Sequence, residues 1–136
     1  MAEGILKQLV KKKGLDWVVE SAGTNGYHTG EPPHPLSQQV ALEHGIDISR
    51  QRAMDFVPSD FDRFDKIYAM ASDVISDIKH IAGKKYDPAK VDLLMNVSEP
   101  GKNRNIPDPW SGPISGYRKV YDMMDEACEK LVASAQ

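Results

Sequence analysis

A chain of 136 residues, of which 40% are hydrophobic, has the size and apolar content of one domain with a single core, so we expect residues 1–136 to form one domain. The formal net charge of −3 excludes the broad basic field that dominates nucleic-acid binding. The sequence contains no apolar run of about 18 residues and no signal peptide, and its one cysteine cannot form an internal disulfide, which together predict a cytoplasmic protein without a membrane-spanning segment.

The chain opens in a segment with helical periodicity. Apolar residues recur at helical spacing over residues 2–10, and Gly14 follows as a stop signal. The three lysines at 11–13 suit the negative end of that helix. Residues 17–19, Trp-Val-Val, form a short apolar run bounded by charge and by the loop-forming residues 21–24. This run predicts a buried strand that leads into a loop.

The rest of the chain alternates between helical and strand-like patterns. Prolines at positions 32, 33 and 35 exclude a helix before position 36. Ser72 stands where an N-cap would precede an apolar helical stripe. The expected elements are, in order, a helix over 36–45, a strand over 64–70, a helix over 72–81, a strand over 91–95, a loop over 98–113 rich in proline and glycine, and a long helix over 117–131.

This alternation predicts the fold class. Strands that alternate with helices form an α/β fold in three layers, with a parallel sheet covered by helices on both faces. The beginning is unusual, because three parallel strands make a small sheet and the first helix has no preceding strand from which to cross over.

Five short motifs follow one another along the chain. They are Met1-Ala2-Glu3-Gly4, Ser21-Ala22-Gly23-Thr24 followed by Tyr27 and Gly30, His44-Gly45-Ile46-Asp47, the run DFDRFDKIYAM over residues 60–70, and Ile106-Pro107-Asp108-Pro109-Trp110. Together they resemble the low-molecular-weight protein-tyrosine phosphatases. The resemblance covers essentially the whole chain in the correct order, so it is far more specific than any one motif.

The resemblance implies a sheet of four parallel strands, whose central first strand leads into a phosphate loop of pattern Cys-x5-Arg-Ser. The sequence begins at the helix after this loop, so the first strand, the nucleophilic cysteine and the arginine have no counterpart in it, a difference of roughly 16 residues. Burial of about four apolar side chains in that strand would contribute roughly 6 to 12 kcal/mol. A typical domain has a net stability of this size. We therefore expect a longer physiological protein, a strand exchanged within a dimer, or a remodelled sheet.

Cys128 is not expected to replace the nucleophile. It lies on the apolar stripe of the last predicted helix, with Met124 and Leu131 at helical spacing. The acidic neighbours Asp122 and Asp125 oppose formation of a thiolate. We expect Cys128 to be buried and inert, and residues 1–136 to contain no nucleophile.

The resemblance implies roles for four residues of a cleft. Asp108 matches the aspartate that protonates the leaving phenolic oxygen and then activates water, during turnover through a cysteinyl-phosphate intermediate. A rigid Pro-Asp-Pro turn is the alternative interpretation of this motif. Tyr27 and Trp110 match aromatic walls that hold a planar phenyl phosphate, with plain surface packing as the alternative. Ser21 matches a serine that supports the phosphate loop by hydrogen bonding.

The expected substrates are phosphotyrosine proteins or small aryl phosphates, and no cofactor is expected. The four histidines show no metal-ligand spacing, which predicts no metal site. The chain departs from the family pattern at Gln51, Ala71 and Val74, and these changes affect the polar surroundings of the phosphate loop. Two alternatives remain open: a catalytically inactive phosphatase-like binding module, and an arsenate reductase of the same fold, which would need redox cysteines in addition to Cys128.

Overall fold

The computed structural model describes residues 1–26, 29–109 and 112–134. Its helices are α1 (Ala2–Lys12), α2 (Pro35–Glu43), α3 (Asp60–Arg63), α4 (Ser72–Ala82), α5 (Met95–Ser98) and α6 (Ile114–Ser134), its strands are β1 (Ile67–Ala69) and β2 (Val91–Leu93), and two short 3-10 turns are η1 (Gly83–Lys85) and η2 (Pro88–Lys90).

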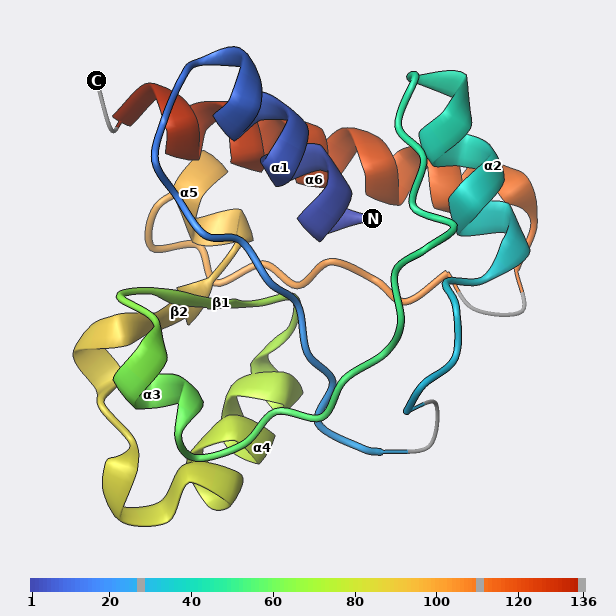
Figure 1. Cartoon of the computed structure of the whole chain (residues 1–136). Coiled ribbons are helices and arrows are strands. Elements are labelled where there is room, and N and C mark those ends of the chain that lie inside the picture. The colour runs from blue at the N-terminus through green and yellow to red at the C-terminus, as the bar shows by residue number, and fades with distance from the viewer. Residues whose placement is uncertain (27–28, 110–111, 135–136) are drawn as a thin grey trace.

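The two strands form a parallel sheet between two groups of helices. In the register of this sheet, Ile67 lies opposite Val91 and Ala69 opposite Leu93. Helices α1, α2 and α6 lie on one side of the strands and α3 and α4 on the other (Figure 1). This arrangement confirms the α/β class with a parallel sheet, and helices make up most of its regular structure.

Side chains of β1 alternate between two hydrophobic clusters, as a strand with both faces covered requires. Tyr68 packs against the larger cluster, whereas Ile67 and Ala69 belong to the smaller one. The larger cluster is built around Ile5, Val40, Ala41, Ile46, Ile48, Leu94, Met95, Ile106, Tyr117, Val120, Tyr121, Met124, Ala127 and Cys128. The smaller cluster is built around Phe56, Phe61, Ala69, Ile78, Ala82 and Leu93.

The predicted buried strand over residues 17–19 is wrong. These residues have no strand conformation, and Trp17 and Val18 are 37% and 77% exposed. Within the described residues they form no backbone hydrogen bond, and pairing begins only further along, with a parallel bridge between Gly23 and Asp55. An apolar run becomes a strand only where a neighbour can pair with it. The described part of the chain places no strand beside this run, so the sheet has two strands instead of the three expected.

The predicted helices are confirmed with small shifts at their ends. Helix α2 is followed by Gly45, whose φ of +77° is the left-handed conformation expected of a helix-ending glycine. Ser72 is the first residue of α4 and does not cap it with its side chain. Its backbone N–H instead donates to the side-chain oxygen of Asn105. The strand expected over 91–95 ends at Leu93, because the short helix α5 begins at Met95.

Two kinds of feature are absent from the described residues. None of their helices is both long and apolar enough to cross a membrane. The same residues contain no group of three or more potential ligands arranged to hold a metal ion.

Candidate active site

The loop that carries Asp108 is fixed to the end of β1. The backbone N–H of Ile106 donates to the carbonyl oxygen of Met70, directly after β1, at 2.8 Å, and the Ile106 side chain is buried in the larger cluster. One residue earlier, Asn105 accepts the backbone N–H of Ser72 at 2.9 Å. In open α/β sheets, ligands bind beyond the carboxyl ends of the strands. The anchored loop therefore holds Asp108 at the end of the sheet where a ligand site is expected.

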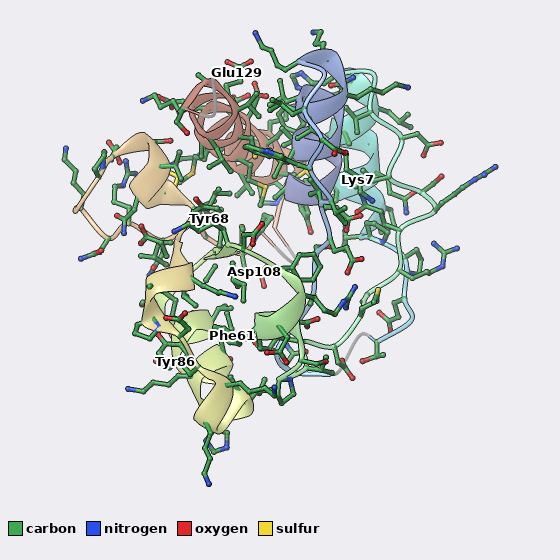
Figure 2. All side chains as sticks on the ribbon, turned by 60° about the vertical axis from the view of Figure 1, so that its left-hand side comes forward. Lys7, Phe61, Tyr68, Tyr86, Asp108 and Glu129 are labelled. Atoms are coloured by element: carbon green, nitrogen blue, oxygen red, sulfur yellow. The ribbon has the colours of Figure 1, made fainter. Side chains whose placement is uncertain are left out.

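A second backbone hydrogen bond holds this loop on the other side of Asp108. Gly112 donates its N–H to the carbonyl oxygen of Pro109 at 2.8 Å, and α6 begins two residues later. Asp108 itself is exposed. In Figure 2 it lies near the middle of the molecule, between the long helices and the part that carries Phe61 and Tyr86. The carboxyl group is thus accessible to a substrate while its backbone is held on both sides.

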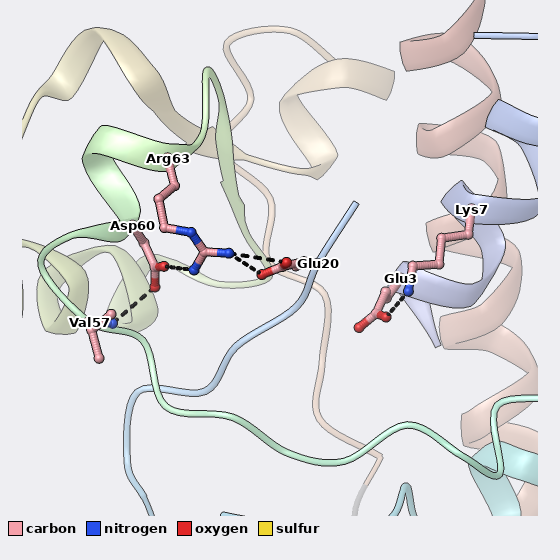
Figure 3. A network of polar contacts seen from close by, with 6 residues as sticks. All are labelled: Glu3, Lys7, Glu20, Val57, Asp60 and Arg63. Atoms are coloured by element: carbon pink, nitrogen blue, oxygen red, sulfur yellow. Dashed lines mark hydrogen bonds and ion pairs between the residues drawn. The ribbon is translucent and has the colours of Figure 1, made fainter. Parts of the chain in front are cut away.

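Ser21 belongs to a polar cluster on α1. Its hydroxyl donates to the Glu3 carboxylate. Lys7 donates to the other oxygen of that carboxylate at 2.6 Å (Figure 3). Burial raises the pKa of Glu3, but the hydrogen bonds from Lys7 and Ser21 outweigh it, and the net effect lowers the pKa of this carboxyl. The sequence predicted that Ser21 supports a phosphate loop by hydrogen bonding and did not identify Glu3 as its partner.

Two hollows border Lys7. One, of about 510 Å³, lies between α1 and the exposed run that contains Trp17 and Val18. The other, of about 380 Å³, includes Glu3 and Arg50 in its lining. The first hollow thus opens beside the segment that was expected to be a buried strand.

The segment before residue 27 and the segment after residue 28 are held against residues 53–56. Gly23 donates to the Met54 carbonyl at 2.7 Å, and Gly30 donates to the Ala53 carbonyl at 2.7 Å. The Thr29 hydroxyl donates to the Asp55 carboxylate at 2.6 Å. These contacts were not apparent from sequence, because they join residues that are more than 20 positions apart.

Side chains, not backbone pairing, hold the exposed run to α3. Arg63 donates to both carboxylate oxygens of Glu20 at 3.2 Å and to Asp60 at 3.1 Å (Figure 3). Asp60, which is 8% exposed, also accepts the backbone N–H of Val57 at 3.0 Å. The ion pair of Glu20 lies on the surface, where such pairs stabilise a fold weakly.

Two of the predicted cleft residues, Tyr27 and Trp110, lie outside the described residues. Cys128 is buried, as expected, with 1% of its surface exposed. Burial, and then the nearby Asp125, raise its pKa to about 12. A thiol in this state has almost no thiolate at neutral pH and is a poor nucleophile.

The described residues thus combine an exposed carboxyl group with a cysteine that is not activated. Asp108 offers this carboxyl group on a loop that is hydrogen-bonded to the end of β1. The Glu3 carboxylate is already engaged by Lys7 and Ser21.

Comparison with known proteins shows a relationship to one family along the whole chain. The family described as low molecular weight phosphotyrosine protein phosphatase matches residues 1–136. The low molecular weight protein-tyrosine-phosphatase YfkJ of Bacillus subtilis is 33% identical over 138 residues, which cover 100% of this chain and 86% of that protein. The low molecular weight phosphotyrosine protein phosphatase of Homo sapiens is 31% identical over 138 residues, covering 99% of this chain and 86% of the human protein.

Solved structures agree with the sequence relationships. The crystal structure of YfkJ superposes with a TM-score of 0.86 at 32% identity, covering 99% of this chain and 84% of that one. A protein tyrosine phosphatase from Entamoeba histolytica, crystallised with Hepes in its active site, superposes with a TM-score of 0.88 at 27% identity, covering 98% of this chain and 86% of that one. The chain therefore belongs to the low molecular weight phosphotyrosine protein phosphatase family.

Proposed function

We propose that this protein is a tyrosine phosphatase that hydrolyses phosphotyrosine proteins or small aryl phosphates through a cysteinyl-phosphate intermediate, with Asp108 as general acid and then as general base. The anchoring of the Asp108 loop to the end of β1 is the observation that supports this role most directly. A positioned acid typically contributes 10²- to 10⁴-fold to the rate. The relatives named above carry the same activity in their names.

The other cleft residues complete this proposal. Tyr27 and Trp110 form aromatic walls for the phenyl ring of the substrate, as the family resemblance implies. Ser21 supports the phosphate loop, and its hydrogen bond to Glu3 places its hydroxyl beside the start of α1, where that loop would end. We also propose a cytoplasmic location, in keeping with a substrate set of phosphoproteins and with the absence of a disulfide in a sequence with one cysteine.

Under this proposal, residues 1–136 do not turn over substrate by themselves. The reason is the state of Cys128, the single cysteine in the sequence, which is buried and has a pKa of about 12. Turnover then requires a strand and a Cys-x5-Arg-Ser loop from outside these residues. The exposed Trp17 and Val18, which border the 510 Å³ hollow beside α1, are compatible with an added strand, including one exchanged within a dimer.

Turnover of p-nitrophenyl phosphate and of a phosphotyrosine peptide tests the proposal. We expect no turnover by residues 1–136, and turnover once the N-terminal strand and loop of the Bacillus subtilis relative are joined before Met1. In that extended protein, Asp108→Asn should lower kcat by roughly 10² to 10⁴. The exposed Asp122 gives the matched control, because Asp122→Asn leaves kcat unchanged.

The outcomes separate the parts of the proposal. Turnover by residues 1–136 alone would contradict the need for an added loop. An inactive extended protein that is nevertheless folded would contradict the assignment as an enzyme. The alternative of an inactive binding module is not favoured, since the relatives found are named as phosphatases.

A further inference from the structure

The side chain of Tyr117 is buried with its hydroxyl group unpaired. Only 1% of the residue is exposed, and the hydroxyl has no hydrogen-bond partner among the described residues. A buried polar group without a partner weakens folding by roughly 5- to 150-fold in the equilibrium constant. Such groups are rare in native proteins, and a catalytic role is one of their recognised explanations. The hydroxyl of Tyr117 is therefore a candidate for such a role.

The position of Tyr117 relates it to the Asp108 loop. It lies in the first turn of α6, which packs against that loop: a Cβ atom built on Gly116 would be 3.7 Å from the Cβ atom of Pro109. The ring of His34, the N-cap residue of α2, stacks on the ring of Tyr117 with centroids 5.2 Å apart. The start of α6 thus packs against the Asp108 loop, and its phenol ring packs against the start of α2.

The electrostatics of this region connect the two groups. Burial, and then the negative charge of Asp108, raise the pKa of Tyr117. The phenol is therefore neutral at physiological pH and retains its hydrogen for donation. A neutral donor near a carboxylate forms a charge-assisted hydrogen bond when the geometry allows it.

We propose that Tyr117 is a positioning residue, whose phenolic hydroxyl donates to the Asp108 carboxylate when that exposed side chain turns toward α6. This inference rests on the proposed role of Asp108. The bond satisfies the buried hydroxyl and sets the direction of the carboxyl group between the proton-donating and proton-accepting steps. Tyr117 does not touch the substrate and acts only through Asp108.

A titration of Tyr117 tests the pairing without any need for turnover. The protein is labelled with ¹³Cζ tyrosine, and the signal of Tyr117 is assigned by its loss in Tyr117→Phe. Removal of the Asp108 charge in Asp108→Asn should lower the titration midpoint of Tyr117 by roughly half to one pH unit. The control Asp122→Asn, on the exposed side of the same helix, should leave it unchanged. Equal midpoints in wild type and Asp108→Asn would overturn the proposal.

A double-mutant cycle at pH 7 gives a second measurement that avoids alkaline conditions. Urea unfolding of the wild type, Tyr117→Phe, Asp108→Asn and the double variant should show coupling of about three- to tenfold in the folding equilibrium constant. Additive effects would contradict the pairing even if Asp108 is the general acid. Coupling without any effect of Asp108→Asn on turnover by the N-terminally extended protein would instead contradict the proposed function, so the two failures are distinguishable.

Discussion

Cys128 should resist alkylation far more strongly than an exposed cysteine. Its pKa of about 12, against an ordinary value of 9.0, lowers the thiolate fraction at pH 7.5 by about a thousandfold. Its 1% exposure adds a further barrier, since the reagent reaches the sulfur only after local opening. Iodoacetamide labelling followed by mass spectrometry measures the rate. The matched control is Ala133→Cys in a Cys128→Ala background, because residue 133 is exposed on the same helix.

Labelling of native Cys128 within tenfold of the control rate would refute this reasoning. The same burial predicts a pH dependence of stability. Because the folded pKa is raised, the thiol stabilises the fold fully below its unfolded pKa of about 9.0. The stabilisation is lost as the pH rises from about 9 toward 12, at up to about 1.4 kcal/mol per pH unit. Urea unfolding at pH 8 and pH 10 measures the loss, and Cys128→Ala should remove that part of the slope.

Three other substitutions test the packing around the site, each by urea unfolding. Gly4→Ala places a Cβ atom 2.6 Å from Cγ2 of the buried Ile48. The overpacking should outweigh the gain in helix propensity and lower the free energy of unfolding by about 1 kcal/mol or more. An increase in stability would contradict the close contact. Asp60→Asn should lower the free energy of unfolding by roughly 1 to 3 kcal/mol, because it removes the charge from a buried acceptor of two hydrogen bonds. The exposed Asp62 gives the control, since Asp62→Asn should change stability by less than about 0.5 kcal/mol. Asn103 has a φ of +52°, so Asn103→Val should cost about 1 to 2 kcal/mol more than Asn103→Gly; equal losses would show that the left-handed conformation is unimportant.

Helical periodicity was sufficient to predict the elements that bury a face along their own length. Helices α1 and α6 have apolar stripes, and their buried residues Ile5, Val10, Tyr117 and Cys128 lie on them. The run at residues 17–19 has the composition of a strand, but its conformation depends on a partner that sequence pattern alone does not supply. Local sequence patterns therefore predicted the helices, which local contacts stabilise. They failed for the run at residues 17–19, whose conformation depends on pairing with a distant segment.

For the candidate site too, the sequence suggested residues but not their contacts. The family resemblance pointed to Asp108 and Ser21 as candidates, whereas the contacts of Ser21 and of the Asp108 loop come from tertiary structure. Ser21 reaches Glu3 across 18 positions, and Asn105, close to Asp108, accepts from Ser72 across 33 positions. No periodicity or motif records such hydrogen bonds, because each needs the fold before it can form.

The attachment of the Asp108 loop to β1 also has an evolutionary consequence. The hydrogen bonds of Asn105 and Ile106 separate the loop into an outer part, residues 99–104, and an inner part that carries the carboxyl group. Insertions or deletions in the outer part leave these two bonds in place, so they leave the acid where it is. Lineages of such a protein are therefore able to vary residues 99–104 while Asp108 keeps its place at the end of β1.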